Sequence, residues 1–221
     1  MRPSQEAVVY MPERDTEDAV SIGAETHSHS DPTKRRASHI PGEGGVWIFI
    51  FGDMCVFAVL FVVFLHARQS DPAAFARDQA HLNANFGAIN TVLLLVSSLF
   101  VVLAMRAVTS RAHSALAPRF IAAAWVCGLG FLVIKAIEYT EKIRDHITPQ
   151  TSEFFMYYFV LTGLHAFHLL LGLAVLVVLY GFAKKSEMSG ARFAFFEGGA
   201  CFWHMVDLLW IVLFPLIFLV R

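Results

Sequence analysis

The sequence predicts an all-α integral membrane protein, a bundle of five transmembrane helices. Of its 221 residues 57% are hydrophobic and 21 are phenylalanine, which is more apolar surface than a soluble domain of this size carries. Five apolar runs are each long enough for the roughly 20 residues that cross a bilayer core. The connections between them are short, so we expect one helical domain over residues 46–221 and no separate soluble domain.

Residues 1–45 have a different composition, rich in Glu, Asp, Ser, Thr, Pro and His. Such a segment cannot bury enough apolar area to offset the entropy of ordering it. We therefore predict a disordered N-terminal tail that lies in the cytoplasm.

The five predicted spans cover about residues 46–66, 88–107, 119–139, 154–182 and 197–220. The fourth is the most apolar, since residues 154–182 hold no Asp, Glu, Lys or Arg. Lys and Arg residues favour the cytoplasmic ends of spans. With the N-terminus inside, nine of them flank inner ends (Lys34, Arg35, Arg36, Arg106, Arg111, Arg119, Lys184, Lys185, Arg192) and five flank outer ends (Arg68, Arg77, Lys142, Arg144, Arg221). This bias predicts a cytoplasmic N-terminus and an outer C-terminus.

Four of the spans contain ionisable side chains. These are Asp53 in the first, Lys135 and Glu138 in the third, His165 and His168 in the fourth, and Glu197, His204 and Asp207 in the last. A carboxylate or lysine at the bilayer centre costs roughly 3 kcal/mol on insertion scales. We therefore expect these groups to face the bundle interior and to pair with one another.

Spacing along a helix suggests which groups pair. Lys135 and Glu138 are three residues apart, so they share a helix face and predict an intrahelical ion pair. By depth and face alone, we expect the two histidines of the fourth span to pair with the polar residues of the fifth span, Glu197, His204 and Asp207. The second span shows only weak polarity, with Asn90 and Ser97, and Thr91 and Ser98, each pair seven residues apart.

Residue chemistry alone leaves four interpretations of these groups open. His165, His168 and His204 could ligate haem or copper. The carboxylates could form a proton or ion path, with Asp53 the best candidate because it stands alone on an apolar span. The groups could hold lipid headgroups or a partner subunit, or they could form an internal network that only fixes helix packing. Cys55, Cys127 and Cys201 form no CxxC or CxxxC pair, so no thiolate metal site is predicted.

Three motifs in the last three spans, KAIEY at residues 135–139, LTGLHAFHLLLG at residues 161–172 and FEGGACFWHMVDLLW at residues 196–210, resemble those of subunit III of the haem-copper (cytochrome c) oxidases. The family's QxxEY segment corresponds to the first motif, its ATGFHGLHVxxG helix resembles the second, and its FExAxxYWHFVDxxW helix resembles the third. Besides the ionisable residues, the matched positions are Tyr139, Thr162, Gly163, Gly172, Phe196, Trp203 and Trp210. The resemblance extends over residues 46–221 and implies the five-helix bacterial form, whose helices correspond to helices III–VII of the seven-helix fold.

Two positions depart from the family pattern. Asp53, in GDMCVFAVLF, stands where a glutamate is typical, and Lys135 stands where glutamine is typical. These features, with the INTVLLLVSSLFV run of the second span, also resemble the NorE-type branch, whose members are associated with nitric oxide reductase. The two branches share the three motifs, so both remain open at this point.

The resemblance implies a non-catalytic, non-redox subunit of a respiratory terminal oxidase in the bacterial inner (plasma) membrane. Haem and copper would lie in partner subunits I and II, and this chain would bind no metal or redox cofactor. Family membership further implies phospholipid binding, support of sustained proton uptake by the catalytic subunit, and Asp53 as the proton-linked carboxyl. The alternatives are an accessory protein that joins nitric oxide reductase subunits and, from another class, a small ion- or proton-coupled transporter, against which the lack of a visible internal repeat counts.

Overall fold

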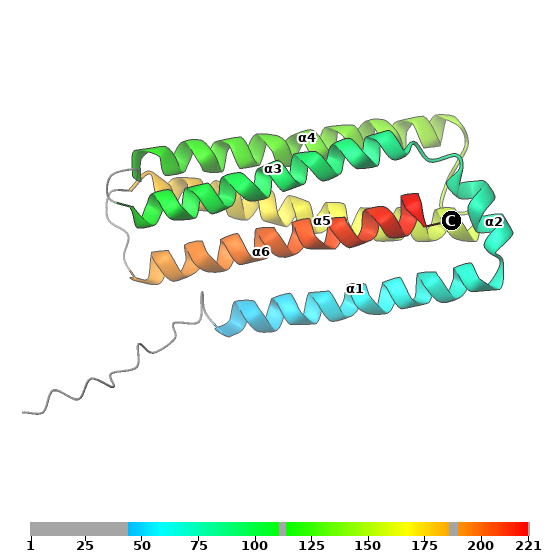
Figure 1. Ribbon diagram of the computed structural model, residues 1–221, viewed down its shortest axis with the longest axis horizontal. Coiled ribbons are helices and arrows are strands. Elements are labelled where there is room, and N and C mark those ends of the chain that lie inside the picture. Colours follow the sequence, from blue (N-terminus) through cyan, green and yellow to red (C-terminus); the bar gives the residue numbers. More distant parts are fainter. Residues whose placement is uncertain (1–43, 111–113, 186–189, 221) are drawn as a thin grey trace, which may run out of the picture. The chain divides into compact units, whose positions relative to one another are not determined.

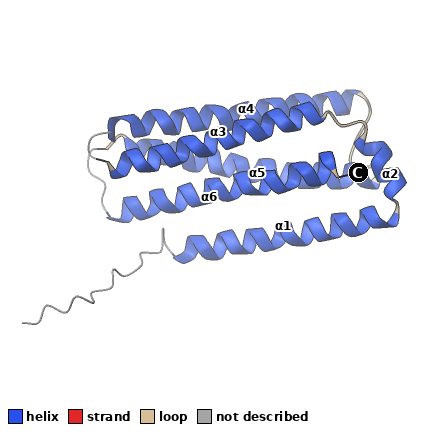
Figure 2. Ribbon diagram, viewed as in Figure 1, coloured by secondary structure: helices blue, strands red, loops and turns tan. Residues whose placement is uncertain are grey.

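The computed structural model describes residues 44–110, 114–185 and 190–220. Apart from Gly44 and Gly45, the predicted N-terminal tail lies outside these described residues. Five long helices run beside one another (Figure 1): α1 (Gly44–Ser70), α3 (Ala84–Thr109), α4 (Ala117–Arg144), α5 (Glu153–Ala183) and α6 (Gly190–Phe214). No strand occurs among the described residues (Figure 2). The predicted all-α membrane bundle is confirmed, because all five helices are long and apolar enough to cross a membrane.

Each helix is longer than the apolar span predicted for it. Arg68, Arg106 and Arg144 lie in the last turns of α1, α3 and α4. The predicted spans ended near the first charged residue, whereas a helix continues through polar turns as it leaves the hydrocarbon. Side-chain caps fix several starts: Asn83 accepts from the amide of Asn85 at 3.0 Å, and Ser152 accepts from the amide of Phe155 at 3.3 Å.

A short helix, α2 (Pro72–Gln79), was not predicted. It follows α1 directly, with Asp71 as N-cap and Pro72 at a first-turn position that needs no amide hydrogen. Its Phe75 is buried against Phe64 of α1 and Phe154 of α5, at ring-centroid distances of 5.8 Å and 5.7 Å. α2 therefore joins the end of α1 to the start of α5.

The end of the last span also differs from the prediction of one continuous helix. At Pro215 the α-helix gives way to a single π-helical turn, η2 (Pro215–Leu219). Proline has no amide hydrogen, so the regular ladder is interrupted there. The side-chain amide of Gln79 in α2 donates to the carbonyl oxygen of Ile217 at 3.0 Å. This bond fixes the π-helical turn to α2.

The core of the domain lies among α3, α4, α5 and α6. α3 packs most extensively on α4, while α6 packs on both α3 and α5. The buried indole of Trp203 occupies the centre: a Cβ atom added at Gly128 of α4 or at Gly172 of α5 would lie 2.8 Å from it. Glycine is thus required at both positions for three helices to meet at one ring. α1 packs less extensively, against α5 and α6.

Candidate functional site in the helix bundle

Lys135 and Glu138 of α4 form the ion pair that their spacing predicts. Nζ of Lys135 lies 2.9 Å from Oε2 of Glu138, and the two side chains are 3% and 1% exposed. The hydroxyl of Tyr158 in α5 donates to the other carboxylate oxygen of Glu138 at 2.7 Å. Each carboxylate oxygen therefore has a donor, and the desolvated charges compensate one another within the bundle.

Aromatic rings surround the Lys135 ammonium group. Its Nζ lies 5.1 to 5.8 Å from four ring centroids, those of Tyr139, Tyr158, Trp210 and Phe218. The negative faces of such rings attract a cation, and more strongly where water is excluded. Lys135 stands where glutamine is typical of the family that the sequence resembles. Its charge is stabilised by one carboxylate and by an aromatic cage drawn from α4, α5, α6 and η2.

The remaining motif positions of α4 and α5 continue this cluster. The hydroxyl of Tyr139 is hydrogen-bonded to that of Thr162, which in turn donates to the backbone oxygen of Tyr158 at 2.6 Å. Gly163 lies beside them, since a Cβ atom there would be 3.8 Å from the Tyr139 hydroxyl. Tyr158 was not singled out from the sequence, because a tyrosine in an aromatic-rich helix gives no signal that it faces a carboxylate.

Asp53 of α1 pairs with His168 of α5. Oδ1 of Asp53 lies 2.9 Å from Nε2 of His168, and the side chains are 11% and 8% exposed. The other ring nitrogen, Nδ1, lies 2.8 Å from the carbonyl oxygen of Leu164. A carbonyl oxygen only accepts, so Nδ1 carries a hydrogen. The contact with Asp53 therefore holds a single proton, either on Nε2 facing a carboxylate or on the carboxyl group facing a neutral imidazole.

The expected pairing of the α5 histidines with the polar residues of α6 is wrong. His168 faces α1 instead. His165 is fully buried, and neither of its ring nitrogens has a hydrogen-bond partner among the described residues. Its ring packs on Phe131 and Trp210, at centroid distances of 5.5 Å and 5.2 Å. Both histidine side chains are buried, as expected of groups that face the bundle interior, but the identity of the helix that each one faces cannot be read from one sequence.

His204 and Asp207 of α6 face α3 rather than α5. Nδ1 of His204 is hydrogen-bonded to the hydroxyl of Ser98, which also lies within hydrogen-bonding reach of the Asp207 carboxylate. One turn further along α6, Nε1 of Trp210 donates to the hydroxyl of Thr91 at 3.0 Å. Glu197 is half-buried near the start of α6, about two turns before His204. The seven-residue spacing of Thr91 and Ser98 was the sequence signal for this face of α3.

No group of three or more His, Cys, Asp or Glu side chains is arranged to hold a metal ion within the part of the chain that the structure describes. His165, His168 and His204 each have different surroundings: the aromatic core, Asp53 and Ser98. They do not converge on one point.

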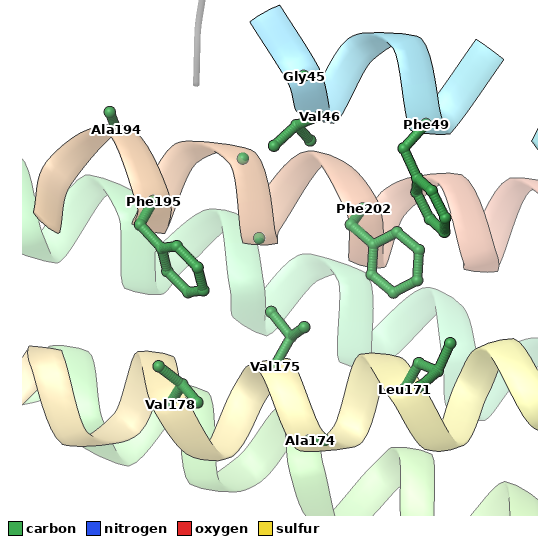
Figure 3. Close-up of a pocket in the computed structure, with 12 residues that line it drawn as sticks. Gly45, Val46, Phe49, Leu171, Ala174, Val175, Val178, Ala194, Phe195 and Phe202 are labelled. Carbon is green, nitrogen blue, oxygen red and sulfur yellow. The ribbon is translucent and has the colours of Figure 1, made fainter. Parts of the chain in front are cut away.

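An apolar pocket of about 570 Å³ lies between the N-terminal end of α1 and helices α5 and α6. Figure 3 shows side chains from all three helices around it, with Phe49 of α1 beside Phe202 of α6 at one end. Those two rings are 5.9 Å apart. Leu171 and Val178 of α5 line its other wall, so the pocket is suited to hydrocarbon.

Comparison with known proteins gives consistent matches. The family model described as cytochrome c oxidase subunit III matches residues 24–220. The chain is 31% identical over 180 residues to cytochrome c oxidase subunit 3 of Alkalihalophilus pseudofirmus, covering 79% of this chain and 84% of that protein. It is 28% identical over 178 residues to cytochrome bo(3) ubiquinol oxidase subunit 3 of Buchnera aphidicola, covering 79% and 84%. It is 30% identical over 177 residues to cytochrome c oxidase subunit 3 of Synechocystis, covering 79% and 74%. With its three motifs on α4, α5 and α6, and with five helices among the described residues that are long and apolar enough to cross a membrane, the chain belongs to the cytochrome c oxidase subunit III family.

Proposed function

We propose that the chain is the non-redox subunit III of a haem-copper respiratory terminal oxidase in a bacterial plasma membrane, where it assembles with subunits I and II. Membership of the subunit III family supports assembly into a multi-subunit oxidase. Haem and copper then belong to the partner subunits, and the chemistry of this chain is limited to packing, lipid contact and proton exchange.

The observation that carries a proton-linked role is the pair formed by Asp53 and His168. Because Nδ1 of His168 donates to a backbone carbonyl, the 2.9 Å contact between Nε2 and Oδ1 needs one proton, and that proton can reside on either group. Oδ2 of Asp53 is enclosed and has no partner among the described residues. The pair can thus exchange a proton without moving a helix, which suits a group that assists proton uptake by a neighbouring catalytic subunit.

We further propose that the pocket between α1, α5 and α6 takes a phospholipid acyl chain. The side chains that line it are apolar, and its walls are transmembrane helices. Lys184 and Lys185 are exposed at the end of α5, roughly 9 Å along the helix axis from Val178 of the lining. Ammonium groups at the end of α5 suit an anionic lipid headgroup whose acyl chain lies in the pocket.

The decisive experiment is purification of the full chain in mild detergent through a C-terminal tag, with co-purifying chains identified by mass spectrometry and by optical spectrum. We expect a haem-bearing catalytic subunit and a copper-bearing subunit II. Relatives of this chain are named for both cytochrome c and ubiquinol oxidases, so the recovered partners also identify the electron donor. Recovery of nitric oxide reductase subunits would move the chain to an accessory role, and a colourless chain without partners would favour the transporter alternative.

A further inference from the structure

A polar cluster lies on the outer surface of the bundle, between α3 and α6. His204 and Ser98 are only partly buried, whereas Asp207 beneath them is 5% exposed. Around His204 and Ser98, the exposed side chains of α3 and α6 are apolar. We call this region the α3–α6 surface and define it by Leu95, Ser98, Val102, His204, Leu208 and Ile211.

This polar cluster lies near the middle of the two candidate membrane spans that carry it. His204 is fourteen residues from Gly190 and fifteen from Leu219, the two ends of its candidate span. Ser98 is similarly placed in the span Ala84–Thr109. A partly exposed imidazole at this depth would face lipid tails, which offer neither a donor nor an acceptor.

The helix α1 does not cover the cluster. It contacts α6 on another side, where Phe49 packs on Phe202 and Val46 lies beside Gly198. Nδ1 of His204 is occupied by Ser98, so Nε2, on the opposite edge of the ring, is the atom that can reach outward. Among the described residues nothing bonds to it.

We propose that the α3–α6 surface is the docking site for a transmembrane helix of a partner subunit, and that this helix presents a hydrogen-bonding side chain to His204 at mid-membrane depth. The apolar residues Leu95, Leu208 and Ile211 supply van der Waals contact, and His204 supplies the polar contact that fixes depth and register. Interhelical contacts in membranes combine these two components, since lipid tails compete equally for apolar surface. The inference rests on the proposed membership of an oxidase complex.

The test uses two bulky substitutions of exposed apolar residues near mid-depth in the whole tagged complex. Leu208→Trp obstructs the α3–α6 surface, and Val133→Trp on α4 is the matched control; these side chains are 46% and 52% exposed, so both variants should fold. We expect Leu208→Trp to lower recovery of partner subunits about tenfold per tagged chain, and Val133→Trp to leave it unchanged. His204→Leu should lower recovery in the same direction.

A photo-reactive benzoylphenylalanine at position 208 or 133 identifies what covers each face. Cross-linking of position 208 to a partner subunit, with none from position 133, would support the proposal. Cross-linking of position 208 only to lipid, to a second copy of this chain or to its own residues 1–43 would overturn it, as would unchanged recovery with Leu208→Trp. If one of these outcomes is found while the wild-type chain still recovers its partner subunits, only the proposed docking site is wrong. If the wild-type chain recovers no partner subunits, the proposed function fails as well.

Discussion

Asp53 of α1 and His168 of α5 lie 2.9 Å apart, Oδ1 to Nε2. The contact joins α1, the least extensively packed long helix, to α5, one of the three helices that carry the motifs. His168 also packs edge-on against Phe57, one turn beyond Asp53, at a centroid distance of 5.4 Å. One residue pair thus combines a proton-sharing contact with the attachment of α1, and the two roles require separate tests.

A hydrophobic carbodiimide should label Asp53 in native membranes. The reagent partitions into the bilayer and adds to a protonated carboxyl group, and at Asp53 the carboxyl group can hold the proton it shares with His168. Peptide mapping by mass spectrometry should find the adduct on the peptide that contains Asp53, and no adduct there in Asp53→Asn. An unlabelled Asp53, with Glu138 or Asp207 labelled instead, would contradict the proton-linked role.

Removal of Lys135 should destabilise the protein strongly. Lys135→Met leaves the Glu138 carboxylate buried without its counter-charge, which costs about 3–5 kcal/mol. The double variant Lys135→Met/Glu138→Gln keeps an acceptor for the Tyr158 hydroxyl and should recover much of that loss. Thermal unfolding in mild detergent, followed by tryptophan fluorescence, measures both. Equal destabilisation by the single and double variants would show that the aromatic cage, and not the charge balance, determines the effect.

A methyl group at Gly172 should disturb the packing of Trp203. The added Cβ would lie 2.8 Å from the indole, and overpacking of this kind typically costs about 1–3 kcal/mol. Gly181, on the same helix, has nothing within 4 Å of its added Cβ. Gly181→Ala should therefore be neutral or stabilise by up to about 1 kcal/mol. The same unfolding assay compares the two, and a Gly172→Ala variant as stable as Gly181→Ala would refute the close approach.

Loss of the Gln79 side-chain amide should loosen α2. Gln79→Leu removes the bond to the Ile217 carbonyl oxygen in η2, at a cost of about 1 kcal/mol. Hydrogen exchange should become faster in α2 and in η2 but not in α3. Arg77→Gln, at an exposed position of the same helix, is the control. Unchanged exchange in Gln79→Leu would indicate that α2 is held by its apolar contacts alone, and equal acceleration in both variants would show that the effect is not specific to the Gln79 bond.

The spans and the Lys135–Glu138 pair could be predicted because both depend on local sequence. Apolar length determines whether a helix can cross the bilayer, and a spacing of three places two side chains on one helix face. The partner of His168 depends instead on which helices are neighbours and how each is rotated, and a single sequence does not encode this in any short pattern. The π-helical turn at Pro215 has a local cause, but hydropathy alone does not reveal it.

The position of Trp203 has a consequence for biogenesis. A membrane protein is inserted from its N-terminus, so α4 and α5 reach the bilayer before α6. Until α6 arrives, Gly128 and Gly172 lack the Trp203 indole that lies against both of them, and Lys135 lacks Trp210 and Phe218 from its cage. The last helix therefore completes the packing and charge shielding of the two before it. Chains that end before α6 would expose a buried cation and an unfilled groove to the machinery that degrades incomplete membrane proteins.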